Sequence, residues 1–176
     1  MKYIKEYNKY VDPFDEDDWD EIEHGSFLTW LKSNYSNEGI WKDIKYINCH
    51  YKQLTDLIGI EKLINLEELI CSNNQLTEID VSKNIKLKIL SCRYNKLTKL
   101  DITKNINLEN LYCHYNQLTE LDITKNINLL QLYCYHNQLK ELNVTKNIEL
   151  KELSCYDNQL TELDTSKNIK LKYIYK

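Results

Sequence analysis

Two cysteine–histidine pairs are the first residues in the sequence whose side chains could do chemistry together. Cys49 is followed by His50, and Cys113 is followed by His114. A thiol beside an imidazole can act as a nucleophile and its base, or supply two ligands to a metal ion. Neighbouring side chains of a strand point to opposite faces, however, so a strand at either position would keep thiol and imidazole apart.

Other residues that could support catalysis are no more convincing. His114 and His136 could approach on a surface, but no third ligand type accompanies them, and a zinc site needs at least three protein ligands. The three glycines are isolated, so no phosphate-binding loop is available. A repeated aspartate indicates turn chemistry rather than an acid–base pair. We therefore predict a protein that is not an enzyme and has no catalytic residue, metal or cofactor. The repeated aspartates are Asp80, Asp101, Asp122 and Asp164.

The cysteines reveal the organisation of the chain, because their spacing is 22 residues once and then 21 residues four times. Disulfide frameworks are rarely so regular, and a buried free cysteine behaves as a small hydrophobic residue. We expect one packed, reduced thiol in each structural repeat. The six are Cys49, Cys71, Cys92, Cys113, Cys134 and Cys155.

The residues around each cysteine repeat with it. Leu66-x-x-Leu69-x-Cys71-x-x-Asn74-x-Leu76 recurs four more times at 21-residue intervals. A degenerate first copy has lysine in place of the asparagine, at Ile44, Ile47, Cys49, Lys52 and Leu54.

This pattern resembles the leucine-rich repeat, LxxLxLxxNxL, over residues 41–176. The 21-residue length and the cysteine are similar to a short bacterial type, of which the internalin J repeats are an example. The resemblance implies an α/β repeat solenoid, a right-handed superhelix with a parallel β-sheet face. The similar bacterial proteins are secreted adhesins, whereas the first thirty residues here lack the apolar stretch of a secretory signal.

Alternation along a strand predicts that Leu69 and Cys71 point inward. The rest of the repeat should return to the same interior through Leu66, Leu76, Ile79, Val81 and Ile85. A lone repeat cannot bury enough apolar surface to offset its ordering entropy, so neighbours must stack. The asparagines should form an internal column whose amides pair with backbone groups. They are Asn74, Asn95, Asn116, Asn137 and Asn158.

Residues 1–40 are expected to form a helical, acidic N-terminal cap on the solenoid of residues 41–176. Tyr3, Tyr7 and Tyr10 fit one face of a helix ending before Pro13, and Ser26 is a candidate start of a second helix. Between these helices lies an acidic patch that could attract a basic surface or simply be a solvated face. It comprises Asp15, Glu16, Asp17, Asp18, Asp20, Glu21 and Glu23, together with Asp12.

The outward positions near each cysteine are rich in tyrosine, a large and stiff side chain that suits recognition. Stacked tyrosines could also simply stiffen the sheet. We predict an exposed partner-binding strip on this side. Its residues are Arg93, Tyr94, Tyr112, His114, Tyr115, Tyr133, Tyr135, His136 and Tyr156.

Together these features predict a non-catalytic protein-binding module. One alternative is an acidic inhibitor, such as a phage-type nuclease or CRISPR inhibitor, that occupies a basic nucleic-acid channel. A second is an internalin-like surface adhesin. The net charge of −4 and pI of 5.6 disfavour direct nucleic-acid binding.

The remaining expectations concern location and self-association. No stretch is apolar enough to span a membrane, so we expect a cytoplasmic protein that does not bind membranes. The chain ends as another strand begins, at residues 171–176, and an uncapped strand could form a homodimer.

Overall fold

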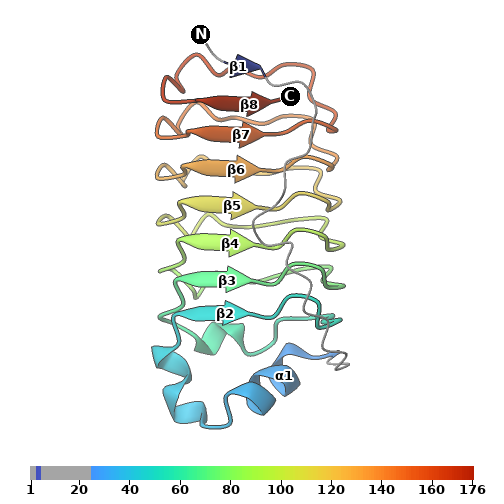
Figure 1. Cartoon of the computed structure of the whole chain (residues 1–176), viewed down its shortest axis with the longest axis vertical. Helices are drawn as coiled ribbons and strands as arrows, with labels where there is room; N and C mark the ends of the chain where they lie inside the picture. Colours follow the sequence, from blue (N-terminus) through green and yellow to red (C-terminus); the bar gives the residue numbers. More distant parts are fainter. Residues whose placement is uncertain (1–2, 5–24) are drawn as a thin grey trace.

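The computed structural model describes residues 3–4 and 25–176. The predicted acidic patch, residues 15–23, lies outside them. Figure 1 shows the strands of the sheet stacked one above another, with a helix at one end of the stack and a short strand at the other. The elements are β1 (Tyr3–Ile4), α1 (Phe27–Asn34), the 3-10 helix η1 (Glu38–Asp43), β2 (Tyr46–Asn48), the 3-10 helix η2 (Ile60–Lys62), β3 (Glu68–Ile70), β4 (Ile89–Ser91), β5 (Asn110–Tyr112), β6 (Gln131–Tyr133), β7 (Glu152–Ser154) and β8 (Tyr173–Tyr175).

All the strands are parallel and form one sheet in the order β1-β8-β7-β6-β5-β4-β3-β2. Each repeat makes one coil, and equivalent positions of successive coils pair in register, as Leu90 pairs with Leu111 and Leu111 with Leu132. The predicted solenoid with a parallel β-sheet face is therefore confirmed. Return segments of the coils consist of turns and extended chain, and helix is concentrated near the amino-terminal end.

The core lies between the sheet and the return segments. Leu69, Cys71, Leu76 and Val81 are fully buried, as the alternation predicts. Ile85 was expected there too, and this expectation is wrong, because its side chain is 53% exposed. The position lies in a tight turn before β4, where only every third residue faces inward.

The helical segment covers the coil that contains β2. α1 begins after Ser26, as predicted, and buries Phe27, Trp30 and Leu31. Trp41 of η1 is also buried, and its indole Nε1 donates to the Tyr35 carbonyl at 2.7 Å. These side chains close the apolar core at the end of the stack.

At the opposite end of the stack, Tyr3 differs from the expectation that it begins the first helix. The rest of that expected helix, with Tyr7 and Tyr10, lies outside the described residues. Tyr3 and Ile4 form strand β1, which pairs with Tyr173 and Ile174 of β8. A strand edge offers unpaired backbone groups, which favours pairing over a helix. The expected homodimer through β8 stays a prediction, and that edge carries β1.

Candidate protein-binding face

A sharp bend follows each strand and sets the direction of the side chains nearby. The second residue after each cysteine has a positive φ of 48–55°, in the left-handed region that bulky residues rarely adopt. The residues at this position are Tyr51, Asn73, Tyr94, Tyr115, His136 and Asp157.

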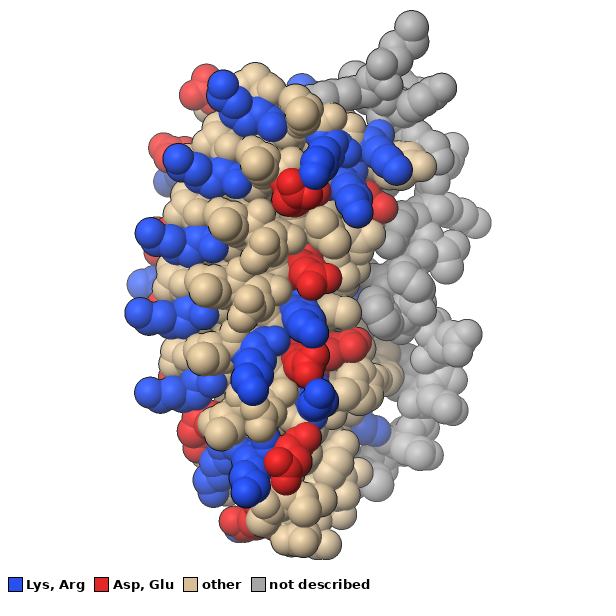
Figure 2. Space-filling view, turned by 90° about the vertical axis from the view of Figure 1, so that its left-hand side faces the viewer, with Lys and Arg blue, Asp and Glu red and all other residues tan. Residues whose placement is uncertain are grey.

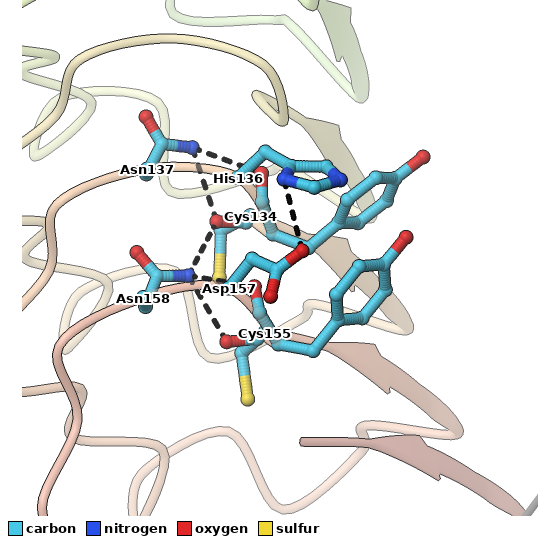
Figure 3. Close-up of polar contacts among 8 residues, drawn as sticks. Cys134, His136, Asn137, Cys155, Asp157 and Asn158 are labelled. Carbon is cyan, nitrogen blue, oxygen red and sulfur yellow. Dashed lines mark hydrogen bonds and ion pairs between the residues drawn. The ribbon is translucent and has the colours of Figure 1, made fainter. Parts of the chain in front are cut away.

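The predicted asparagine column holds this bend in place. Asn116 Nδ2 donates to the carbonyls of Cys92 and Cys113, and its Oδ1 accepts from Leu97 N at 3.0 Å. Figure 3 shows the same arrangement for Asn137 and Asn158, whose amides reach the cysteine carbonyls. The amides pair with backbone groups of two adjacent coils, so the prediction is confirmed, and each bend is fixed to its neighbour.

Aromatic rings stack from coil to coil at the bend. The ring centroids of Tyr94 and Tyr115 lie 4.2 Å apart, and the two ring planes are nearly parallel, with an angle of 11° between them. Tyr115 and His136 are also 4.2 Å apart, at 30°. The next residue in the column, Asp157, continues the series with a polar contact, its Oδ2 lying 3.1 Å from His136 Nδ1 (Figure 3).

A second stack runs beside the first, one residue earlier in each coil. The ring centroids of His114 and Tyr135 are 4.4 Å apart, and those of Tyr135 and Tyr156 are 4.5 Å apart. Tyr115 contacts Tyr135 edge-on at 5.5 Å, which joins the two stacks. We call the stacked surface of Tyr94, Tyr115, Tyr135, His136 and Tyr156 the aromatic face.

The last residue of each strand lies beside these stacks. Tyr112 and Tyr133 meet edge-on at 5.3 Å. Their hydroxyls donate to Gln131 and Glu152 respectively, each on the next coil. Tyr112 is half-buried at the border of the aromatic face.

Three residues of the predicted strip are outward but not exposed, which corrects the expectation. Arg93, His114 and Tyr133 have 3%, 1% and 4% of their surface accessible. The His114 ring lies within 6.4 Å of Tyr94, Tyr115, Tyr133 and Tyr135, measured between centroids, and these rings cover it. The exposed part of the strip is consequently narrower than predicted.

The cysteine–histidine pairs are separated as the strand geometry requires. Cys113 is fully buried in the core, whereas His114 stacks on the outer side of the sheet. Burial raises the pKa of the Cys113 thiol well above its ordinary value, and raises that of Cys92 to about 12. The thiols are therefore protonated packing groups, and the described residues contain no cluster of three or more His, Cys, Asp or Glu arranged for a metal.

The repeated aspartates act in turns, as predicted. Asp101 Oδ1 accepts from the backbone N–H and the hydroxyl of Thr103, at 2.9 and 2.7 Å. These hydrogen bonds hold the pKa of Asp101 below its usual range, and the bond from the Thr103 hydroxyl has the larger effect. The corresponding residue of a later coil is Asn143, which makes the same bonds to Thr145.

A second asparagine column was missed at the sequence level. Asn105 is fully buried, and its Nδ2 donates to the carbonyls of Val81 and Asn84 on the preceding coil. The sequence did contain a signal for this column, because the triplet Lys-Asn-Ile recurs every 21 residues. The members are Asn84, Asn105, Asn126, Asn147 and Asn168.

The comparisons with known proteins agree with this geometry. Residues 64–105 match the family model described as Leucine Rich repeats (2 copies). A leucine-rich-repeat protein of Leptospira interrogans has a similar structure, with a TM-score of 0.67 and 25% identity over 74% of this chain and 36% of that one. The chain thus has the leucine-rich-repeat fold, and residues 64–105 match the repeat sequence of that family.

Two further structures are similar to this chain. The leucine-rich-repeat domain of a Shigella effector has a TM-score of 0.68 and 24% identity over 86% of this chain and 66% of that one. The functional domain of internalin J from Listeria monocytogenes, which includes a cysteine ladder, has 28% identity and a TM-score of 0.38 over 78% and 45%. Among curated proteins, none matches the sequence.

The chain spans between about a third and two thirds of the length of these structures. Leucine-rich repeats commonly serve as protein–protein interaction modules and are typically not catalytic. In the described part of this chain, no helix has the length and apolar character needed to cross a bilayer.

Proposed function

We propose that this protein is a non-catalytic binding module whose protein partner docks on the aromatic face. The observation that carries the proposal is the continuous stack of Tyr94, Tyr115 and His136 across three coils. Tyr94 and Tyr115 are 39% and 36% exposed, so part of each ring and its surroundings is open to a partner.

The backbone of the bend adds a second argument. A left-handed conformation costs an ordinary L-residue about 1–2 kcal/mol, and asparagine and aspartate tolerate it better than other residues do. Two coils have Asn73 and Asp157 at this bend, whereas the first coil has Tyr51 and the three consecutive middle coils have aromatic residues. The middle residues are Tyr94, Tyr115 and His136. The fold alone would favour asparagine in every coil, so the aromatic residues of the middle coils favour a role in recognition.

Stacking also prepares the surface for binding. Rings held at 4.2–4.5 Å by their neighbours lose little additional side-chain freedom when a partner arrives. Tyrosine supplies apolar area and a hydroxyl on the same side chain, which is the combination common at interface hot spots.

The test uses a substitution that the bend tolerates. Tyr94→Asn and Tyr115→Asn, made together, introduce the residue that Asn73 already provides in the same position. The matched control is Tyr46→Asn with Tyr173→Asn, which removes two exposed tyrosines of β2 and β8 that lie outside the stack.

Proteins captured from a native lysate by the immobilised chain provide the readout. We expect a protein retained by the wild type and by the control variant to be lost from the Tyr94/Tyr115 variant, because truncating a central aromatic commonly costs about 2 kcal/mol or more. Retention of every captured protein by both variants would refute the aromatic face as the docking surface.

A further inference from the structure

Two consecutive tight turns lead into each strand on the side away from the aromatic bends. In the coil before β4, Asn84 N donates to the Val81 carbonyl at 3.0 Å, and Leu87 N donates to the Asn84 carbonyl at 3.1 Å. The residues that the turns share, Val81, Asn84 and Leu87, are buried. Residues between them are turned outward, and these include Lys83 and Ile85.

The outward isoleucine forms a ladder of exposed apolar side chains. Five members are 50–53% exposed, and Ile169 at the end is 83% exposed. Because adjacent strands lie about 4.8 Å apart, the ladder is about 24 Å long. A contiguous apolar strip of this kind marks an interaction site more often than isolated exposed residues do. Its members are Ile64, Ile85, Ile106, Ile127, Ile148 and Ile169.

A lysine ladder runs beside it, two residues earlier in each coil. Figure 2 shows basic side chains projecting in a regular column along one edge of this side of the molecule, next to a band of uncharged residues. No ion pair or hydrogen bond joins these ammonium groups to other groups in the described part of the chain. The lysines are Lys83, Lys104, Lys125, Lys146 and Lys167.

Other lysines of the same coils differ in this respect. Lys88 Nζ and Lys45 Nζ lie 2.7 and 3.0 Å from Glu67, and Lys170 Nζ lies 2.6 Å from Glu149. Turn aspartates lie near four of the five ladder lysines, as Asp101 lies near Lys104, and their ionised carboxylates offset part of the ladder's charge. These carboxylates accept hydrogen bonds within the turn and form no ion pair with the ladder lysines among the described residues. The ladder lysines thus keep ammonium groups available for an external anion.

We propose that this strip, the Ile–Lys ridge, docks on the surface of a membrane that contains anionic lipids. Isoleucines would enter the headgroup boundary, and the flexible lysine side chains would reach the lipid phosphates and carboxylates. Each lysine near an anionic bilayer strengthens binding, and apolar side chains add to it. Attachment of this kind is peripheral and needs no spanning helix. The proposal therefore departs from the expectation of no membrane binding, which was drawn from the lack of a spanning apolar stretch.

The chemistry of the ridge favours lipid over two other occupants. Nucleic-acid sites combine cations with aromatic rings on which bases stack, whereas the ridge combines cations with aliphatic side chains. A second copy would need a matching acidic column beside its own isoleucines. The position after each isoleucine is instead occupied by Asn65, Lys86, Asn107, Asn128, Glu149 and Lys170.

The ridge precedes each strand and the aromatic bend follows it, so the two surfaces lie at opposite ends of the strands. The proposal is therefore independent of the partner proposed for the aromatic face. A chain attached through the ridge would leave that face accessible to a protein.

The experiment measures co-sedimentation of the full chain with vesicles of phosphatidylcholine alone and with phosphatidylserine added. One variant carries Lys83→Gln, Lys104→Gln and Lys125→Gln, and a second carries threonine at Ile85, Ile106 and Ile127. The charge-matched control carries Lys45→Gln, Lys88→Gln and Lys170→Gln, which removes the same charge from paired lysines.

We expect binding only to the vesicles with phosphatidylserine, weaker at high salt, and reduced tenfold or more in both ridge variants but little in the control. Absence of vesicle binding, or an equal loss in control and lysine variants, would overturn the proposal. So would tighter binding to duplex DNA than to the vesicles. A dimer seen by light scattering without lipid, and abolished in the isoleucine variant, would assign the ridge to a second copy instead.

Discussion

Replacing Asn116 with leucine tests the asparagine column that joins the coils. The substitution removes the acceptor of Leu97 N, which is a buried backbone donor with no other hydrogen-bond acceptor among the described residues. Leaving that donor unpaired costs about 1–3 kcal/mol. The carbonyls of Cys92 and Cys113 each lose one of two side-chain donors, because Asn95 and Asn137 still reach them.

The two weakened carbonyls add about 0.5 kcal/mol each, at the lower end of the net value of a hydrogen bond. The expected loss of unfolding free energy is therefore about 3 kcal/mol. Urea denaturation followed by circular dichroism measures it, and at an m-value of about 2 kcal/mol/M the midpoint falls by about 1.5 M.

Gln117→Leu is the matched control, because it places leucine at the adjacent, exposed position. Its unfolding free energy should stay within about 0.5 kcal/mol of the wild type. If Asn116→Leu were as stable as this control, the asparagine amides would not be what holds the coils together, and the reasoning about both columns would be wrong.

Three further predictions concern single residues. Tyr115→Asn should change the unfolding free energy by less than about 1 kcal/mol, because relief of the left-handed backbone offsets two lost ring stacks of about 0.5–1.5 kcal/mol each; urea denaturation checks this. Hydrogen bonds from Thr103 lower the pKa of Asp101 from its ordinary value of 3.8, so the ionised carboxylate stabilises the fold above that pH, and the contribution is lost as the pH falls through the lowered pKa. The stability difference between wild type and Asp101→Asn, measured by urea denaturation at several acidic pH values, should therefore shrink as the pH falls, and a constant difference would contradict the assignment. Cys113 should resist alkylation at mildly alkaline pH until the chain is unfolded, because burial raises its pKa; mass spectrometry of iodoacetamide-treated protein would reveal rapid native labelling if this is wrong.

The sequence predicted the coil but not all of its surface. Spacing and strand alternation were enough to place Cys71 and Leu69 inside and Tyr112 outside, because a period of two residues leaves no other register. The outward direction of Tyr94 and Tyr115 depends instead on the left-handed bend two residues after each cysteine. Alternation does not apply in the turns, so Ile85 was placed in the core although it lies on the surface.

The aromatic strip shows the same limit for a different reason. The positions of Tyr133 and His114 in the repeat predict that their side chains point outward from the sheet. Their burial could not be predicted in this way, because it depends on rings contributed by neighbouring coils. Pairing of β1 with β8 was also beyond a local pattern, because it joins residues from the two ends of the chain.

Because successive coils have equivalent positions in register, the gene can gain or lose whole repeats. The asparagine hydrogen bonds between coils use a position that is the same in five successive coils, as Asn95 and Asn116 show. Duplication or deletion of one 21-codon unit would keep these asparagine hydrogen bonds at the new junction while lengthening or shortening both outer ladders by about 4.8 Å. Unequal recombination would thus change the length of these outer surfaces without requiring a different fold.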